Sequence, residues 1–214
     1  MRKIFLLLLL FPLIGVSQVL TIGGEVLKHQ NMVLRKNYIY IDGNAWVEKA
    51  PKLGAATFIY TLCVYNGKLY GGTAFNGKLY EWNGTNAWVE KAPKLGAEEF
   101  ITSLCVYNGK LYGGTNPNGK LYEWNGTNAW VEKAPNLGGE TDILSLCVFN
   151  GKLYGSTNPS GKLYEWNGVN AWVEKAPTLG TETYIFSLCV YNGKLYGGTA
   201  LNGKLYEWNA ILKP

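Results

Sequence analysis

The sequence predicts an all-β fold built from a repeated, four-stranded antiparallel unit. Three observations predict it: a composition rich in glycine, tyrosine and tryptophan, a strict repeat of 42 residues, and Asn-Gly turns between short apolar runs. The chain has 214 residues, of which 47% are hydrophobic and only 16% charged. It is therefore long enough and apolar enough to form one well-buried domain, and its composition argues against disorder.

The first 17 residues are expected to be an export signal. Arg2 and Lys3 form a basic start, residues 4–14 are an apolar stretch, and Gly15-Val16-Ser17 supplies small residues for cleavage. The stretch is shorter than the about 20 apolar residues that a membrane-spanning helix needs, so we expect no stable membrane insertion after cleavage. The mature protein is expected to be secreted, periplasmic or at the cell surface.

Three columns of residues recur every 42 positions along the rest of the chain. They are Trp46, Trp88, Trp130 and Trp172; Cys63, Cys105, Cys147 and Cys189; and Trp82, Trp124, Trp166 and Trp208. A fixed period of this length is typical of solenoids and propellers, in which each unit needs its neighbours to bury its faces. An apolar period of 3.6 residues is absent, and this excludes a helical solenoid.

Each unit is expected to contain four short strands joined by tight turns. In the first unit these are Ile59–Tyr65, Lys68–Thr73, Lys78–Trp82 and Ala87–Ala92. Asn66-Gly67 is a strong hairpin signal, and Pro93 ends the fourth strand because proline cannot donate to a ladder. Four such strands make one twisted blade, so the sequence predicts a small β-propeller with tryptophan rings buried between blades.

Several motifs resemble known propeller repeats. A Gly-Gly pair (Gly71-Gly72), followed by Tyr80 and Trp88, resembles the kelch repeat, and the Asn-Gly-Lys-Leu-Tyr runs are similar to the repeats of tachylectin-type lectins. The resemblance covers residues 45–208, but the period is short for kelch and Ser156 replaces the second glycine in the third unit. Kelch repeats would imply a protein-interaction or carbohydrate-related scaffold, and tachylectin-like repeats would imply sugar binding.

The number of blades is open at this point. Residues 45–214 hold four near-identical repeats, and residues 18–44 are either a degenerate first blade or an N-terminal extension. We favour five blades with the degenerate one first. In the alternative of four blades, residues 45–50 supply the fourth strand of the last blade and close the ring by strand pairing. The chain could equally be a piece of a longer array, or several chains could share one ring as an oligomer.

The residues for most catalytic and cofactor chemistry are missing. His29 is the single histidine and Asp42 and Asp142 are the two aspartates, so we expect no cofactor, no metal and no enzyme. Removal of Arg2 and Lys3 lowers the formal net charge from +5 to +3, and no basic run follows, so nucleic acid is not an expected partner. The cysteines are expected to be free and buried, because blade symmetry separates equivalent positions.

Glutamates recur at two positions in each unit, where they are read as cross-strand charge pairs with equally repeated lysines. They are Glu48, Glu90, Glu132 and Glu174, and Glu81, Glu123, Glu165 and Glu207. The alternative is an exported glycan-cleaving enzyme that uses these carboxylates at the mouth of the ring.

The four units differ mainly at one end of the predicted blades, in the loop that enters the first strand and in the turn between the second and third strands. Loop tips tolerate change, which would explain the variation without a function. The other interpretation is a contact surface for a glycan or an extracellular protein, bound without catalysis and at several equivalent sites. Its candidate residues are Glu98, Glu99, Phe100, Asn116, Glu140, Asp142, Asn158, Glu182 and Tyr184. A structural module without a small-molecule ligand is a further alternative.

Overall fold

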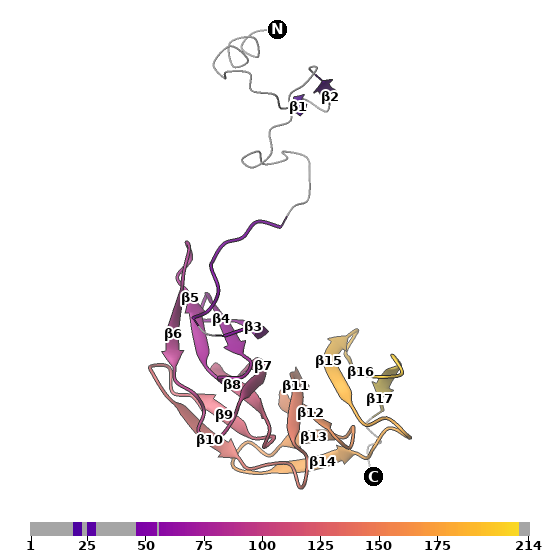
Figure 1. Ribbon diagram of the computed structural model, residues 1–214. Coiled ribbons are helices and arrows are strands. Elements are labelled where there is room, and N and C mark those ends of the chain that lie inside the picture. The colour runs from indigo at the N-terminus through magenta and orange to yellow at the C-terminus, as the bar shows by residue number, and fades with distance from the viewer. Residues whose placement is uncertain (1–18, 23–24, 29–45, 55, 210–214) are drawn as a thin grey trace. The chain divides into compact units, whose positions relative to one another are not determined.

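The computed structural model describes residues 19–22, 25–28, 46–54 and 56–209 (Figure 1). The chain divides into two compact units, residues 1–48 and 49–214. In the first unit, β1 (Val19–Ile22) and β2 (Glu25–Lys28) pair as an antiparallel hairpin. The predicted export signal and most of the predicted degenerate blade lie outside the described residues. Within the described part of the chain, no helix has the length and apolar character needed to cross a membrane.

In its described residues, the second unit contains three four-stranded sheets and one three-stranded sheet, each with its strands paired in chain order. The first sheet is β3 (Ile59–Tyr65), β4 (Lys68–Thr73), β5 (Leu79–Trp82) and β6 (Trp88–Ala92). The second is β7 (Phe100–Tyr107), β8 (Lys110–Asn116), β9 (Leu121–Trp124) and β10 (Trp130–Ala134). The third is β11 (Asp142–Phe149), β12 (Lys152–Asn158), β13 (Leu163–Trp166) and β14 (Trp172–Ala176). The fourth is β15 (Ile185–Tyr191), β16 (Lys194–Thr199) and β17 (Leu205–Trp208).

The predicted four-stranded unit is therefore confirmed, with bounds that differ by one residue at two strand starts. The third and fourth strands of the first sheet begin at Leu79 and Trp88 instead of Lys78 and Ala87. The Asn-Gly turns form as expected: Asn66 has a φ of 48° and Gly67 a φ of 72°. Two successive positive φ values are typical of the tight hairpin turn whose twist matches that of the flanking strands.

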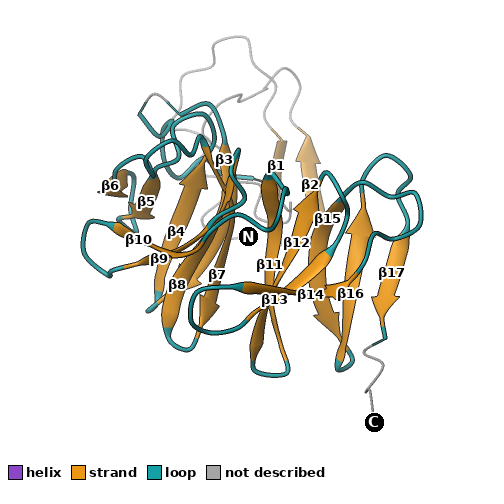
Figure 2. Ribbon diagram, turned by 90° about the horizontal axis from the view of Figure 1, so that it is seen from below, coloured by secondary structure: helices purple, strands orange, loops and turns teal. Residues whose placement is uncertain are grey.

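Successive sheets stack along an arc within the second unit. The first strands of the sheets, β3, β7, β11 and β15, contact one another in that order and lie on the inner side of the arc. Figure 2 shows the sheets from below, so that outer strands such as β14 lie in front of the inner ones. The fourth strands, β6, β10 and β14, lie on the outer side in Figure 1. The first and fourth sheets stand at opposite ends of the arc, so the ring is open.

The hydrophobic core lies between neighbouring sheets, and the same positions build it at each joint. At the joint between the first and second sheets it contains Tyr70, Leu79 and Ala92 from one side, and Leu95, Ile101, Leu104, Leu111 and Trp124 from the other. The corresponding residues, 42 positions on, form the core between the second and third sheets. The predicted burial of tryptophan between blades is confirmed for Trp124 and Trp166. Stability of each sheet thus depends on its neighbours.

The Gly-Gly pairs in β4 and β8 are explained by two close contacts, shown here for β8. A Cβ at Gly113 would lie 3.1 Å from the ring of Trp130, which crosses over the strand from β10. A Cβ at Gly114 would lie 2.7 Å from the side chain of Ile143, which comes from the next sheet. The first glycine therefore admits the tryptophan of its own sheet, and the second allows the next sheet to approach.

A hydrogen bond also joins each pair of sheets. The backbone N–H of Leu104 donates to Thr61 Oγ1 of the preceding sheet at 3.1 Å. The same bond recurs from Leu146 to Ser103 Oγ at 2.9 Å and from Leu188 to Ser145 Oγ at 3.1 Å. Because β7, β11 and β15 are edge strands of their own sheets, these amides depend on the neighbouring sheet for their acceptor.

The four cysteines lie on the inner strands, and all four thiols are free. The prediction of free thiols is confirmed, but that of burial holds only in part, since Cys189 is exposed and the other three are half-buried. Burial, with a contribution from the neighbouring Cys147 and Cys63, raises the pKa of the Cys105 thiol to about 12.

Candidate functional site

The loops that vary between units lie together at one end of the stacked sheets, as the sequence predicts. The backbone N–H of Gly77, in the turn after β4, donates to the carbonyl of Glu99 at 2.9 Å. The N–H of Glu99 in turn donates to the carbonyl of Asn116 at 2.9 Å. The loop that enters the second sheet is therefore held between the turn of the first sheet and the end of β8.

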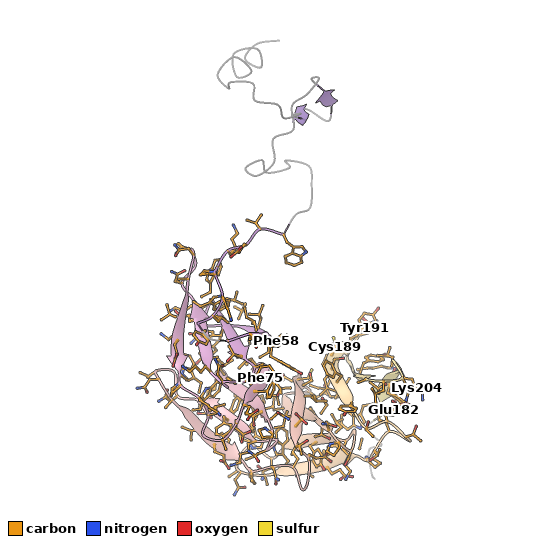
Figure 3. All side chains as sticks on the ribbon, in the orientation of Figure 1. Phe58, Phe75, Glu182, Cys189, Tyr191 and Lys204 are labelled. Atoms are coloured by element: carbon orange, nitrogen blue, oxygen red, sulfur yellow. The ribbon has the colours of Figure 1, made fainter. Side chains whose placement is uncertain are left out.

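Three of the predicted site residues are fully buried glutamates that fasten these loops. Glu98 accepts hydrogen bonds from the backbone N–H of Asn118 at 3.2 Å and from its side-chain nitrogen at 3.0 Å. Glu140 accepts from the N–H of Ser160 at 3.1 Å. Glu182 binds Asn202 and forms an ion pair with Lys204 at 2.8 Å, and Figure 3 shows this pair in the fourth sheet. Hydrogen bonds and an ion pair within the protein engage these buried carboxylates, so they are not available to a ligand at the surface.

Three further predicted residues, Asn116, Asp142 and Asn158, form one polar cluster that links the second and third sheets. The carboxylate of Asp142 accepts hydrogen bonds from the side-chain amides of Asn116 and Asn158, the second at 2.7 Å. Thr141 Oγ1 also donates to it, at 2.8 Å. Asp142 is buried and both of its carboxylate oxygens accept hydrogen bonds within the cluster, so the cluster serves to connect the second and third sheets.

An exposed group of aromatic rings, which we term the aromatic cluster, occupies the same end above the first and second sheets. It consists of Phe58, Tyr60, Phe75 and Phe100. Ring centroids are 5.9 Å apart for Phe58 and Phe75, 4.9 Å for Phe75 and Phe100, and 6.0 Å for Tyr60 and Phe100. Phe58 and Phe75 are 59% and 60% exposed, and Figure 3 shows the two labels beside each other.

Phe75 is held in an unusual backbone conformation. Its φ is 63°, in the left-handed region that a bulky side chain rarely adopts. The ring is nevertheless exposed, so it contributes little buried surface to offset that strain. Leu201, at the same turn position of the fourth sheet, has a φ of 70°, so this backbone conformation belongs to the turn and is shared by the first and fourth sheets.

Of the predicted site residues, only Glu99 and Phe100 belong to this surface: Phe100 is in the aromatic cluster and Glu99 is its exposed neighbour. Tyr184 is half-buried at the equivalent position of the fourth sheet. The site prediction did not include Phe58, Tyr60 and Phe75. The signal that would have found them is the comparison between the 42-residue repeats, since the repeat that forms the first sheet carries an aromatic residue at each of three variable positions. The expected binding at several equivalent sites stays a prediction.

The repeated glutamates form the charge pairs that the sequence predicts. Lys68 contacts Glu81 at 2.9 Å and Lys78 contacts Glu90 at 2.8 Å. The second and third sheets repeat both pairs, and the fourth repeats the first pair between Lys194 and Glu207. Burial alone would raise the pKa of Glu81, but hydrogen bonds from Lys68 and Tyr70 outweigh it and lower the pKa below 4.5. A general acid in glycoside cleavage needs a raised pKa, so Glu81 and its equivalents Glu123, Glu165 and Glu207, whose pKa values are all lowered, are poorly suited to that role. No group of three metal-ligating side chains occurs in the residues that the structure covers.

Comparison with known proteins shows likeness at the level of structure. No family model matches the sequence, and no curated protein matches it. Among solved structures, a computationally designed protein, Ika4, is 16% identical with a TM-score of 0.54 over 77% of this chain and 98% of that chain. A catalytically inactive virginiamycin B lyase from Staphylococcus aureus is 13% identical, with a TM-score of 0.55 over 72% of this chain and 56% of that chain.

The WD40 β-propeller domain of Doa1 is also similar, at 13% identity and a TM-score of 0.52 over 71% of this chain and 51% of that chain. The fold is that of a β-propeller. Each four-stranded sheet is a blade, and the blades are not closed into a ring. The chain spans about half the length of the lyase and WD40 chains that it matches. The finer resemblance to kelch or tachylectin repeats stays a prediction, as do the predicted closed rings of four or five blades.

Proposed function

We propose that this protein is a secreted, non-catalytic binding module that recognises a glycan through the aromatic cluster. The observation that carries the proposal is the exposure of Phe58 and Phe75, 59% and 60%, on a rigid blade scaffold. Aromatic rings that project into water offer flat apolar faces, and the C–H faces of sugar rings stack on such surfaces. Loops fixed by a stable scaffold are a frequent location of binding sites.

Polar groups beside the rings complete a surface suited to a polyhydroxylated ligand. Glu99 is exposed next to Phe100, and its backbone is fixed by hydrogen bonds on both sides. A carboxylate held in this way accepts hydrogen bonds from sugar hydroxyls without a large loss of side-chain and loop freedom. Stacking would then provide affinity, and the carboxylate would provide orientation.

The test uses a glycan array, followed by titration of the best glycan against the full chain and two variants. Phe75→Gly removes one ring of the aromatic cluster, and glycine adopts the positive φ of this position without strain. We expect this variant to fold as well as the parent and to lose at least ten-fold in affinity. Asn150→Gly is the matched control, because Asn150 has a φ of 48° in the turn between β11 and β12, at the opposite end of the blades. It should keep the parent affinity.

Two results would contradict the proposal. One is the absence of binding to any arrayed glycan at millimolar concentration, which would favour a protein ligand or a structural module. The other is binding that Phe75→Gly leaves unchanged, which would place the site elsewhere on the propeller.

A further inference from the structure

The two ends of the blade arc expose residues whose equivalents are covered by the neighbouring sheet at the joints inside it. Leu62, on β3, is 56% exposed, whereas Leu104 and Leu146 at the same position of the next two sheets are each 7% exposed. Leu205, on β17, is 73% exposed, whereas the equivalent Leu79, Leu121 and Leu163 are at most 3% exposed. Each end therefore presents one half of the joint that the inner sheets form with each other.

The two exposed halves are complementary. Every inner joint packs the Leu79-type face of one sheet against the Leu104-type face of the next. The fourth sheet leaves its Leu79-type face uncovered, and the first sheet leaves its Leu104-type face uncovered. A head-to-tail contact between these ends would repeat the joint that is already present three times in the second unit.

The hydrogen bonds between sheets show the same unfinished series. Thr61, Ser103 and Ser145 each accept a hydrogen bond from the backbone of the following sheet. Ser187 is the next hydroxyl of the series and is exposed. The backbone N–H of Leu62 is the matching donor at the opposite end. Neither group takes part in a bond between sheets among the residues that the structure describes.

A strand is also missing from the fourth sheet, which has three strands in the described part of the chain. The sequence of the fourth strand occurs once more as Trp46–Ala50, ahead of the first sheet. Trp46 is fully exposed, at 105%, and no strand is formed there. The equivalent segment β6 is the fourth strand of the first sheet, and the chain passes from it directly into the second sheet. By the same order, Trp46–Ala50 would be the fourth strand of a sheet that precedes the first one.

We propose that a second copy of this chain completes the ring. The first sheet of each copy packs on the fourth sheet of the other, and Trp46–Ala50 of the partner subunit adds to β17 as the fourth strand. The register follows from the first sheet, where Trp88 lies opposite Trp82 and Ala92 opposite Leu79. Trp46 of the partner subunit then lies opposite Trp208, and the partner subunit's Ala50 opposite Leu205. Two such joints close a ring of two-fold symmetry.

The curvature of the arc favours two copies over closure within one chain. The first and fourth sheets stand at opposite ends of the arc in Figure 1. About 70% of this chain superimposes on about half of two longer propeller chains, covering 56% of the lyase and 51% of the WD40 domain with TM-scores of 0.55 and 0.52. One chain therefore supplies about half of a ring of this curvature, and a second copy supplies complementary ends.

The first test is the mass of the full chain in solution, measured by light scattering or native mass spectrometry. We expect twice the mass of one chain. Leu62→Arg places a charge in the joint and should give the mass of one chain while the β-sheet spectrum is retained. Val131→Arg is the control, since Val131 is 50% exposed on the outer strand β10 and should keep the double mass. A parent protein with the mass of one chain, or of three or more, would overturn the proposal.

Cross-linking distinguishes two copies from a single chain that closes on itself, and it does not depend on the Leu62 variant. The joint would bring Cys189 next to Cys63 of the partner subunit, as Cys105 neighbours Cys147 inside the arc. Two variants are prepared, both with Cys105→Ser and Cys147→Ser. One also carries Cys63→Ser and retains only Cys189, and the other also carries Cys189→Ser and retains only Cys63. The two variants are co-expressed and treated with a short bis-maleimide. We expect a cross-linked product of two chains from the mixture and none from either kind alone. No such product from the mixture would overturn the proposal.

Discussion

Leu121→Ala tests whether the joints between blades hold the protein together. Leu121 is 0% exposed and packs with Leu137, Ile143 and Leu153 at the joint of the second and third sheets. The substitution removes three carbon atoms, which at about 0.8 kcal/mol each corresponds to about 2.4 kcal/mol of lost transfer free energy. The cavity left in a joint between two rigid sheets raises the expected loss of unfolding free energy to about 3–5 kcal/mol.

Urea unfolding followed by tryptophan fluorescence measures this loss, because the emission of the eight tryptophans, Trp166 of the same cluster among them, changes on unfolding. Val131→Ala is the control: Val131 is half-exposed on the outer strand of the same sheet, so its loss should stay within about 0.5 kcal/mol. A Leu121→Ala variant as stable as the parent would refute the reasoning that packing between sheets, and not the sheets themselves, carries the stability.

Two further predictions concern the buried glutamates and the charge pairs. Glu98→Ala should lower the unfolding free energy by about 1–3 kcal/mol, because it leaves the backbone and side-chain amides of Asn118 without their acceptor. Glu99→Ala is the control, since Glu99 is the exposed neighbour and should tolerate alanine. Equal losses of stability for the two variants in thermal melts would contradict the anchoring role of Glu98. Burial would raise the pKa of Glu123, but hydrogen bonds from Lys110 and Tyr112 lower it below 4.5, so its stabilisation is present above that pH and is lost as the pH falls through the folded-state pKa. The fall in melting temperature between pH 7 and pH 3 should therefore be smaller in Glu123→Gln, and an unchanged fall would exclude this contribution.

The repeated unit was predictable because its signals are local. Asn66-Gly67 determines a tight turn by its own backbone preferences, and the runs on either side have the apolar, β-branched and aromatic residues that favour strands. Strand starts at Leu79 and Trp88 were missed by one residue because they follow longer turns. The Gly-Gly pair could be recognised as a motif, but its cause, the approach of Trp130 and Ile143, involves residues 17 to 29 positions away.

The site was predicted less well because it depends on contacts between loops. Glu98 looks like a surface residue in the sequence, yet the fold brings it against Asn118, twenty positions later, and buries it. Phe58 is exposed because no sheet precedes the first one in the arc, whereas its equivalent Phe100 is half-buried against Phe75 of the preceding sheet. The curvature of the arc depends on the angle between stacked sheets, which a repeat length of 42 residues does not encode.

Hydrogen exchange at the amides of Leu104, Leu146 and Leu188 tests the stacking of blades most directly. Each of these amides lies on an edge strand and donates to a hydroxyl of the preceding sheet, so its protection requires that sheet to be in place. We predict that all three exchange as slowly as the central strands of their sheets. Exchange at the rate of open edge strands, in a protein whose sheets are otherwise protected, would contradict the stacked arrangement.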